Sequence, residues 1–453
     1  MKKITKYQHC KVLVLGLAKS GFSAAKLLHE LGALVTVNDG KPFEENPEAQ
    51  DLLAMGIRVI TGSHPIELLD EEFSLVVKNP GISYSNPLVA KAQSLGLPII
   101  TDVELAYEIA EAPIIGITGT NGKTTTTTMI GLLLNAQRAK GEARLAGNIG
   151  FPASDVAQKA TADDVMVMEL SSFQLLGIET FRPEIAVITN IYEAHLDYHG
   201  NREEYKLAKW RIQENMINED TLIINYQQAE LVELAKTTKA KVIPFSTKSV
   251  VKEGAYVEAD KIYFQAEEIM AVKEIGVPGS HNVENALAAI AVAKLAGVSA
   301  ETIRLTLSKF TGVAHRTQFV GEVAGRKFFN DSKATNILAT EMALGGFEGE
   351  PLVLLAGGLD RGNGFEALVP ALKNVKTLIV FGETAQKLVA AGEQAGIANI
   401  YVTENVETAV PLAFEKSQAG DTILLSPANA SWDQYPNFEV RGEKFIQAVN
   451  NLR

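Results

Sequence analysis

Residues 113–125 constrain this chain more than any other stretch, because they join a buried strand to a glycine-rich turn. The apolar run Ile114 to Ile117 predicts the strand, and the turn from Gly119 to Gly122 delivers Lys123 and Thr124 to a helix start. In such turns backbone N–H groups and the helix N-terminus bind phosphate, a lysine reaches the outer phosphates, and a hydroxyl ligates Mg²⁺. A Walker A motif requires glycine where this chain has Ile117, so the stretch is a shorter variant of that motif.

Composition limits the classes of partner. The chain has 453 residues, 46% of them hydrophobic, which suits two or three globular domains. A net charge of −12 argues against nucleic-acid or membrane-surface binding, so local lysines, helix ends and metal ions must capture any anionic substrate. Cys10 is the single cysteine, and no apolar stretch approaches the ~18–20 residues of a membrane span. We therefore expect a cytoplasmic protein without a disulfide, a signal peptide, a nucleic-acid partner or a membrane partner.

The N-terminal region predicts a βαβ unit. Residues 11–17 form a continuous apolar run, 20–31 carry a helical pattern, and 34–38 form a second apolar run that ends at Asp39. An acidic residue about 20 positions beyond the first glycine is typical of a Rossmann unit, but Ala18 replaces the middle glycine of the dinucleotide fingerprint. The pattern therefore favours a nucleotide other than NAD at these strand ends.

Two further α/β units follow. Apolar strands are expected at 164–169, 185–190, 221–225 and 241–246, a hairpin at 256–264 and a helix at 282–296. Strands at 352–356, 377–381, 400–403 and 422–426 then alternate with helical segments, which is typical of a doubly wound parallel sheet. The predicted fold is α/β with three domains: an N-terminal Rossmann-like unit (1–106), a central P-loop-type ATPase domain (107–313) and a C-terminal doubly wound parallel sheet (314–453).

Several polar groups follow predicted strands. Glu169 ends an apolar strand near the phosphate turn, where ligands of parallel sheets bind, and we interpret it as a Mg²⁺ ligand rather than a solvated cap. His195 and His199 are spaced for zinc on a helix, but Gly200 ends any such helix and no His-Glu-x-x-His motif is present. His195 is the better candidate for a metal or substrate contact, and His199 is expected to be an exposed turn residue.

Two polar stretches lie in the C-terminal unit. Residues 330–336 place Asp331, Lys333 and Thr335 between a strand and a helix, where they suit ribose, phosphate or carboxylate contacts and exceed what a helix cap needs. Residues 427–434, which include Ser431, follow the last strand, and composition leaves both a substrate pocket and a simple turn open.

Taken together, these motifs resemble the Mur ligase family, the ATP-dependent amide ligases of peptidoglycan precursor synthesis. The resemblance runs nearly end to end. It rests on separate motifs: Gly119-Thr-Asn-Gly-Lys-Thr124, Gly147-Asn-Ile-Gly150, Glu169-Leu-Ser-Ser-Phe-Gln174, Asn282-Val-Glu-Asn285, His315-Arg316, Asn330-Asp-Ser-Lys-Ala-Thr-Asn336, and Ser426-Pro-Ala-Asn-Ala-Ser-Trp-Asp433 with Phe438.

The resemblance implies a reaction. ATP phosphorylates the carboxylate of UDP-N-acetylmuramoyl-L-alanine, the amine of D-glutamate attacks the acyl phosphate, and ADP and phosphate are released. Activation is needed because a carboxylate is a poor electrophile, and Lys123 with Mg²⁺ offsets the repulsion of two anions. The resemblance also implies two Mg²⁺ ions, a carbamylated Lys209, and small-molecule partners only; we expect a monomer. Without it, the residue pattern predicts Lys209 on a helix surface.

Roles carry over position by position from the resemblance. The expected metal ligands are Thr124, Glu169, His195 and Lys209, and the expected catalytic groups are Lys123, Glu169, His195, Lys209 and Lys333. The expected ATP contacts are Gly119, Thr120, Asn121, Gly122, Lys123, Thr124, Thr125, Asn282, Asn285, Arg316 and Asp331. The expected contacts of the uridine substrate and of D-glutamate are Ser20, Asp39, Asn148, Ser171, Gln174, Lys333, Thr335, Arg361, Ser431 and the backbone of Phe438.

The chain departs from the family pattern twice. Arg361 follows the Gly-Gly-x-Asp stretch where some relatives have lysine, so a carboxylate can be held by two parallel bonds. Gly40 beside Asp39 leaves the uracil contact with one side chain fewer than expected. The main alternative is a folylpolyglutamate synthetase-type glutamate ligase, which shares the phosphate turn. This chain instead carries about a hundred residues of nucleotide-binding-like unit in front of the turn.

Overall fold

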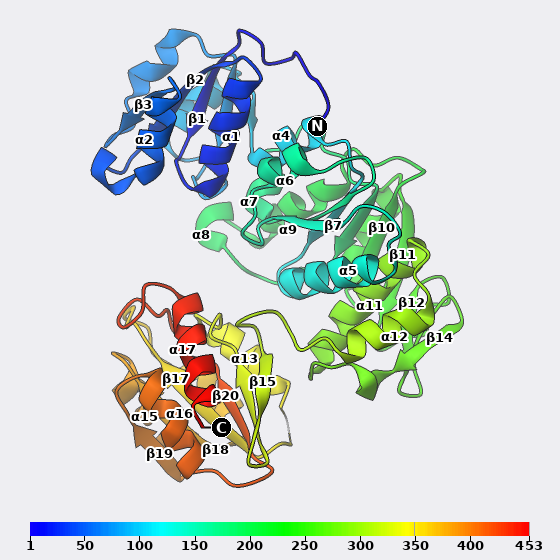
Figure 1. Ribbon diagram of the computed structural model, residues 1–453, viewed down its shortest axis with the longest axis vertical. Helices are drawn as coiled ribbons and strands as arrows, with labels where there is room; N and C mark the ends of the chain where they lie inside the picture. Colours follow the sequence, from blue (N-terminus) through cyan, green and yellow to red (C-terminus); the bar gives the residue numbers. More distant parts are fainter. Residues whose placement is uncertain (348, 453) are drawn as a thin grey trace. The chain divides into compact units, whose positions relative to one another are not determined.

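The computed structural model describes residues 1–347 and 349–452, which form three β-sheets (Figure 1). The chain divides into two compact units. One comprises Met1–Val272 with Glu284–Thr306, and the other comprises Lys273–Val283 with the chain from Leu307 onward. The first unit contains two sheets and the second contains one, and each unit is described by itself below.

The first sheet has five parallel strands: β1 (Lys11–Leu15), β2 (Leu34–Asp39), β3 (Arg58–Thr61), β4 (Leu75–Lys78) and β5 (Ile99–Ile100). Its helices are α1 (Lys19–Glu30), α2 (Pro47–Ala54), α3 (Pro87–Ser94) and α4 (Asp102–Ile109). The strand order is β3-β2-β1-β4-β5, so the direction of strand addition reverses between β1 and β4. Ligands of such sheets bind outside the carboxyl ends of the strands at this reversal.

The second sheet has nine strands: β6 (Ile114–Thr118), β7 (Ala143–Gly147), β8 (Val165–Glu169), β9 (Ile185–Ile188), β10 (Thr221–Asn225), β11 (Lys241–Ser246), β12 (Ala255–Glu258), β13 (Lys261–Phe264) and β14 (Glu267–Ala271). Its order is β14-β13-β12-β11-β10-β9-β6-β8-β7, with β13 and β14 antiparallel to their neighbours. The accompanying helices are α5 (Lys123–Gln137), α6 (Ala153–Lys159), α7 (Ser172–Leu175), α8 (Leu196–His199), α9 (Arg202–Trp210), α10 (Ala229–Leu234), α11 (Ser280–Leu295) and α12 (Ala300–Ser308).

The third sheet has six strands: β15 (Gln318–Val323), β16 (Arg326–Asn330), β17 (Leu352–Gly357), β18 (Val375–Phe381), β19 (Asn399–Val402) and β20 (Thr422–Leu425). Its helices are α13 (Ile337–Gly345), α14 (Val369–Leu372), α15 (Ala385–Gln394), α16 (Val406–Glu415) and α17 (Phe438–Asn450). The order is β15-β16-β20-β17-β18-β19, and only the edge strand β15 runs antiparallel to its neighbour.

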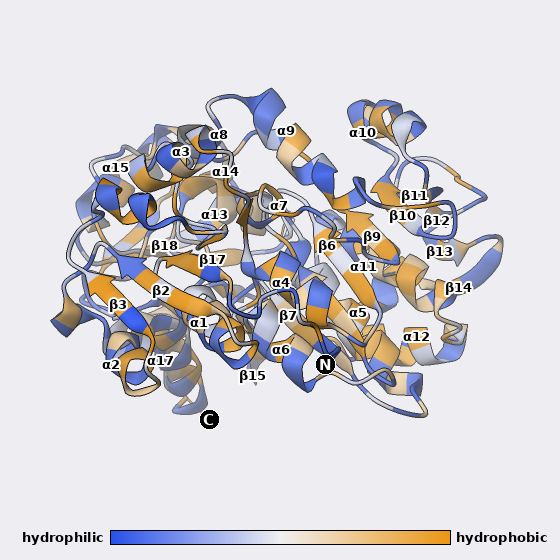
Figure 2. Cartoon of the chain, turned by 90° about the horizontal axis from the view of Figure 1, so that it is seen from above, coloured by the Kyte–Doolittle hydropathy of each residue, from blue (hydrophilic) through white to orange (hydrophobic). Residues whose placement is uncertain are grey.

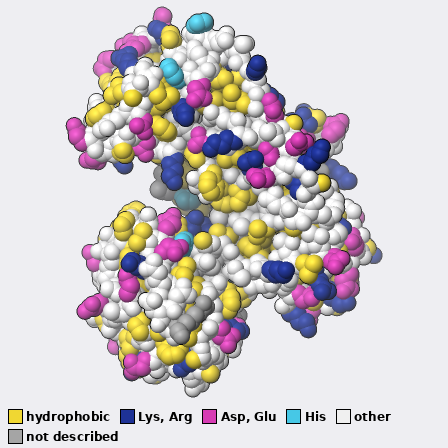
Figure 3. Space-filling model, viewed as in Figure 1, with side chains coloured by type: hydrophobic (Ala, Val, Ile, Leu, Met, Phe, Trp, Pro, Cys, Tyr) yellow, Lys and Arg dark blue, Asp and Glu magenta, His cyan; other side chains and the backbone are white. Residues whose placement is uncertain are grey.

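Burial follows the expected patterns. Strands such as β2, β9 and β17 are mainly hydrophobic in Figure 2, and β6, β8, β17 and β20 are buried along their whole lengths. Two separate apolar clusters cover the opposite faces of the third sheet, as strand periodicity requires. Figure 3 shows acidic and basic side chains interspersed over the visible face. No helix among the described residues has the length and apolar character to cross a membrane.

The strands and helices expected from the apolar runs are confirmed to within a few residues. The α/β class with three sheet domains is also confirmed, including the hairpin, which is β12 and β13. The antiparallel edge strand β15 is an addition to the expected parallel sheet, because its half-buried residues give a weak apolar pattern.

Candidate active site

The phosphate turn has a backbone that only glycine accommodates. Gly119 and Gly122 have φ values of +150° and +80°, in the left-handed region. A Cβ at Gly119 would lie 1.9 Å from Thr189 Oγ1, and one at Gly122 would lie 2.1 Å from Asn285 Oδ1. Both glycines are therefore required for the turn to pack against the end of β9 and against α11.

The strand next to the turn holds it in shape. Thr120 N donates to the Asn190 carbonyl and Asn121 N to Asn190 Oδ1, both at 2.8 Å. Thr189 Oγ1 donates to the Asn121 carbonyl at 2.6 Å. Lys123 Nζ folds back over the turn and donates to the carbonyls of Gly119 and Thr120 at 2.8 and 2.9 Å. Thr124 and Thr125 follow in the first turn of α5, with Thr124 buried.

Glu169 carries a buried oxygen that suits a cation. It ends β8, whose residues pair with β6, and its side chain is 2% exposed. Asn148 Nδ2 donates to Glu169 Oε1 at 2.8 Å, whereas no described residue donates to Oε2. A buried carboxylate oxygen without a donor is costly unless a cation or another donor reaches it. The residues here therefore fit a hard divalent cation.

Lys209 is not a surface residue, and the expectation from its residue pattern was wrong. Its side chain on α9 is 1% exposed, Nζ donates to the Gly119 carbonyl at 2.7 Å, and the ammonium lies 4.7 Å from the centre of the Tyr205 ring. Burial, with the nearby Lys123 ammonium, holds the pKa of the Lys209 amine well below its usual range, and Glu169 acts in the opposite direction. Two lysines and a carboxylate thus converge on one turn.

The histidines differ from each other. His195 is exposed, has a left-handed backbone (φ 55°), and its ring centre lies 5.1 Å from that of Phe173. His199 was expected in an exposed turn and is instead half-buried at the end of α8. It stacks on Phe173 and lies 3.0 Å from Ser172 Oγ. The described residues contain no group of three His, Cys, Asp or Glu side chains able to hold a metal, so phosphate, hydroxyl or water oxygens would have to complete a Mg²⁺ shell.

A second group of expected residues surrounds one cavity of about 440 Å³ in the first unit. Ser20, Asn148, Ser171 and Gln174 all line it, although Ser20 belongs to the first sheet domain and the others to the second. Ser171 and Gln174 form a capping box at the start of α7. The sequence thus predicted four residues that the fold brings together.

The same cavity contains residues that the sequence did not indicate. Asn79 Nδ2 donates to Ser20 Oγ at 3.1 Å. Asp102 lies at the start of α4 with 2% exposure; Ala153 N donates to its Oδ2 at 2.8 Å, and Oδ1 is buried without a described partner. Burial raises the pKa of the Asp102 carboxyl to about 6. A lone aspartate before an apolar helix reads as a cap, so no sequence signal distinguished it.

Asp39 connects β2 to the glycine turn after β1. Leu17 N donates to Asp39 Oδ2 at 2.7 Å, and Lys41 N donates to Oδ1 at 2.8 Å. The carboxylate thus fixes the turn over which a nucleotide would lie, and each oxygen retains a lone pair for a ligand.

Asn285 and Asn282 share α11 but lie in different surroundings. Asn285 packs beside Gly122 of the phosphate turn, and Thr126 Oγ1 donates to its Oδ1 at 3.3 Å. Asn282 Nδ2 donates to the Pro278 carbonyl at 2.6 Å within the second unit.

The second unit contains the remaining expected residues, and most of them lie on loops after its strands. Burial raises the pKa of the Asp331 carboxyl to about 7, although Ser426 Oγ donates to it at 2.8 Å and Arg316 acts in the opposite direction. Lys333 Nζ lies 5.2 Å from the centre of the Phe438 ring. Thr335 is half-buried two residues before α13, whereas Ser431 is buried and its Oγ has no described partner. Arg361 is exposed and lies over the Trp432 ring.

Arg441, which the sequence did not indicate, joins three of these loops. Its guanidinium is fully buried and donates to Ser332 Oγ, to the Ser332 and Asn429 carbonyls (both 2.9 Å) and to the Gly357 carbonyl (3.3 Å). Ser332 and Asn429 follow β16 and β20, and Gly357 is the last residue of β17, so one side chain fixes the carboxyl edge of the sheet.

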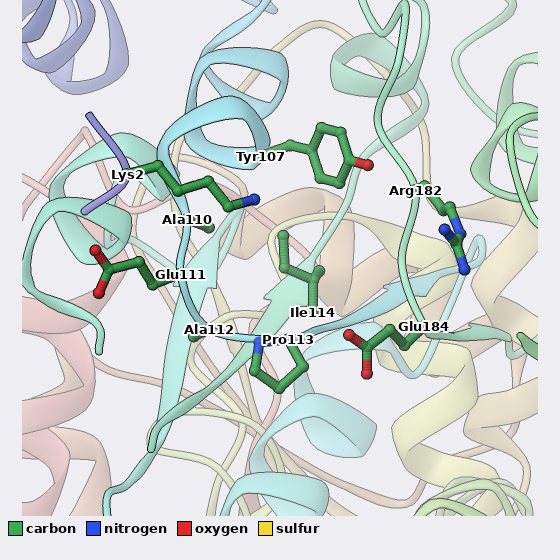
Figure 4. A pocket seen from close by; sticks show the side chains of 9 residues that line it. All are labelled: Lys2, Tyr107, Ala110, Glu111, Ala112, Pro113, Ile114, Arg182 and Glu184. Atoms are coloured by element: carbon green, nitrogen blue, oxygen red, sulfur yellow. The ribbon is translucent and has the colours of Figure 1, made fainter. Parts of the chain in front are cut away.

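A cavity of about 330 Å³ lies at the edge of the second sheet where β6 begins, away from the phosphate turn that follows β6 (Figure 4). Lys2 and Arg182 line it together with Glu111 and Glu184. Arg182 is already engaged by Asp220 at 2.7 Å. The balanced charges give no reason to assign a ligand there.

Comparisons with known proteins agree with this architecture. Models of the "Mur ligase MurD-like, N-terminal domain", the "Mur ligase middle domain" and the "Mur ligase, glutamate ligase domain" match residues 10–101, 117–293 and 315–429. The UDP-N-acetylmuramoylalanine–D-glutamate ligase of Enterococcus faecalis is 71% identical over 453 residues, covering 100% of this chain and 99% of that protein. The ligase of the same name from Enterococcus hirae is 70% identical, covering 98% of this chain and 96% of that protein.

Solved structures show the same fold at low identity. The UDP-N-acetylmuramate–alanine ligase MurC of Thermotoga maritima superimposes with a TM-score of 0.60 at 20% identity, covering 98% of this chain and 100% of that one. Since the three domain models and the full-length relatives agree, the chain belongs to the Mur ligase family of ATP-dependent, amide-bond-forming ligases.

Proposed function

We propose that this chain adds D-glutamate to UDP-N-acetylmuramoyl-L-alanine, with release of ADP and phosphate, in peptidoglycan precursor synthesis. The name of relatives about 70% identical over their whole length supports this substrate pair. The observation that carries the chemistry is the group of Lys123, Lys209 and Glu169 at a preformed phosphate turn.

The chain's own residues account for carboxylate activation. A substrate carboxylate oxygen attacks the γ-phosphorus of ATP, ADP leaves, and the D-glutamate amine then attacks the acyl carbon, losing a proton while phosphate departs. Lys123 offsets charge on the outer phosphates as the two anions approach. Thr124, Glu169 and His195 would hold Mg²⁺, which neutralises phosphate charge and orients the transferred group.

Lys209 suits carbamylation. A lysine amine must be neutral to attack the carbon of CO₂, and burial beside Lys123 favours that neutral form. The new N–C bond, with loss of a proton, leaves a carbamate anion that could serve as an oxygen ligand for a second Mg²⁺. The carbamate would also place a negative charge beside the Lys123 ammonium, in place of a neutral amine.

The Lys209→Ala variant tests this role. We expect a loss of phosphate release of at least about a hundredfold, because a metal ligand is removed, and partial recovery with added acetate, which restores a carboxylate. Lys206→Ala on the same helix, where Lys206 pairs with Glu203, should retain activity. Absence of recovery at any acetate concentration would contradict the carbamate proposal.

The remaining residues divide among the substrates. We assign the carboxyl edge of the first sheet and the 440 Å³ cavity to the uridine substrate. The residues concerned are Ser20, Asp39, Asn148, Ser171 and Gln174. We assign ATP to Gly119–Thr125 with Asn282, Asn285, Arg316 and Asp331, and D-glutamate to Lys333, Thr335, Arg361, Ser431 and the Phe438 backbone. We also propose domain boundaries at 106/107 and 313/314, a cytoplasmic monomer, and no nucleic-acid or membrane partner.

A phosphate-release assay tests the function directly. Purified protein with ATP, Mg²⁺, UDP-N-acetylmuramoyl-L-alanine and D-glutamate should release phosphate, whereas L-glutamate should not replace D-glutamate. A parallel assay with a folate substrate and L-glutamate tests for the alternative, a folylpolyglutamate synthetase-type ligase. Activity in that assay alone would overturn the proposal.

A further inference from the structure

The loop after β3 packs beside the end of β2, at the carboxyl edge of the first sheet. In Rossmann-like sheets the diphosphate lies on the turn after β1, and an acidic residue at the end of β2 faces the nucleoside. Here Asp39 is that residue, and the loop after β3 packs beside it: Gly62 N donates to the Asp39 carbonyl at 3.0 Å and to the Lys41 carbonyl at 2.9 Å. Side chains of the β3 loop can therefore reach a nucleoside bound at Asp39.

His64 in this loop has a fixed orientation. The fully buried Asn38 donates both amide hydrogens, to the Ile60 carbonyl at 3.1 Å and to the Ser63 carbonyl at 2.8 Å. Its Oδ1 then faces His64 Nδ1 at 2.6 Å, so Nδ1 is the donor of that pair. In the neutral imidazole this assignment leaves Nε2 as a hydrogen-bond acceptor.

Nε2 occupies the space that a side chain at position 40 would fill. A Cβ on Gly40 would lie 2.8 Å from His64 Nε2 and 3.4 Å from Cε1. His64 and a side chain at position 40 are thus mutually exclusive in this conformation. Gly40, noted above as a missing uracil contact, is the residue that makes room for the imidazole.

We propose that His64 is a specificity-determining residue that binds the nucleoside of the uridine substrate through Nε2. It replaces the contact that Gly40 cannot supply, and accepts a hydrogen bond from uracil N3–H or from a ribose hydroxyl. The ring is half-buried and Asn38 fixes its Nδ1 edge, which suits recognition. This inference rests on the proposed function for the identity of the nucleotide.

The His64→Phe variant keeps an aromatic ring beside Gly40 and removes both nitrogens. We expect KM for the uridine substrate, and the inhibition constant of UDP, to rise about tenfold, with kcat and KM for ATP and D-glutamate unchanged. His29→Phe, at an exposed histidine of α1, is the matched control and should change none of these constants. A change in KM below twofold would overturn the proposal.

Two further measurements separate the explanations. N3-methyl-UDP lacks the uracil N3–H and 2′-deoxy-UDP lacks a ribose hydroxyl, so together they should identify the group that donates to Nε2. The analogue that lacks this donor should bind wild type more weakly than UDP does. In the His64→Phe variant the same analogue and UDP should bind with equal affinity. If both analogues keep their penalties in the variant, Nε2 accepts from neither group and the proposal fails. Calorimetry measures the binding of UDP to His64→Phe even if the protein shows no ligase activity. Failure of the proposed function can therefore be distinguished from failure of the His64 proposal.

A compensating substitution tests the exclusion between positions 40 and 64. Gly40→Ser alone should weaken UDP binding, because the new side chain meets the imidazole. The double variant with His64→Ala should recover most of the affinity, since the hydroxyl then has room to reach the nucleoside. Equal affinities of Gly40→Ser and the double variant would contradict this arrangement.

Discussion

Asp102 offers a sharp test of burial at the 440 Å³ cavity. Its carboxyl has a pKa raised from 3.8 to about 6, because only hydrogen bonds from Ala153 and Ser154 offset its loss of solvent. A difference of about two pKa units is worth about 3 kcal/mol. Asp102 ionises at a lower pH in the unfolded chain, so its contribution to stability is greatest below pH 4 and is lost as the pH rises from about 4 to about 6.

The Asp102→Asn variant removes this dependence. The amide oxygen can accept the same two backbone hydrogen bonds, and the side chain cannot ionise. We therefore expect the free energy of unfolding of the variant, minus that of wild type, to increase by about 3 kcal/mol between pH 4 and pH 7 and then to stay constant.

Urea unfolding at a series of pH values measures this difference. Trp210 is buried in the same compact unit as Asp102, so its fluorescence in a Trp432→Phe background reports the unfolding of that unit. Asp163→Asn, at an exposed carboxyl, is the control for the removal of one acidic side chain. If the difference in unfolding free energy between Asp102→Asn and wild type does not change with pH, then burial does not raise the pKa of the Asp102 carboxyl and our reasoning is wrong.

Two other substitutions test buried charges. Glu104 accepts hydrogen bonds from Glu179 N, from Phe181 N and from both Thr180 N and Thr180 Oγ1. Glu104→Gln should lose two of these charge-assisted hydrogen bonds and about 3 kcal/mol of unfolding free energy. A loss below about 1 kcal/mol would refute this expectation. Arg441→Met should raise KM for D-glutamate at least about tenfold, with KM for the uridine substrate unchanged, because three loops lose a shared donor. Arg441→Lys should recover little of this loss, and an equal rise in both KM values would contradict a specific effect on D-glutamate binding.

The sequence predicted the sheets well because their strands are buried on both faces. Continuous apolar runs such as those of β6 and β20 leave few alternatives, and the glycines of the phosphate turn report a backbone that other residues resist. The edge strand β15, half-buried and antiparallel, carried no comparable pattern.

The site was predictable only in part, because burial of a polar residue depends on elements distant in the sequence. Lys209 lies on a helix with a charged face, and nothing in its neighbours shows that the phosphate turn, 90 residues earlier, covers it. His199 was misplaced for the same reason, since Phe173 and Ser172 come from another helix. Asp102, Arg441 and His64 gave no motif at all, and their roles follow from their partners.

The contacts around the phosphate turn bear on the thermodynamics of nucleotide binding. Asn190 and Thr189 hold the backbone of the turn by hydrogen bonds from the protein itself, so its conformational entropy is lost on folding. ATP would therefore bind to a turn that is already ordered, and little of its binding free energy would be lost to ordering of the loop.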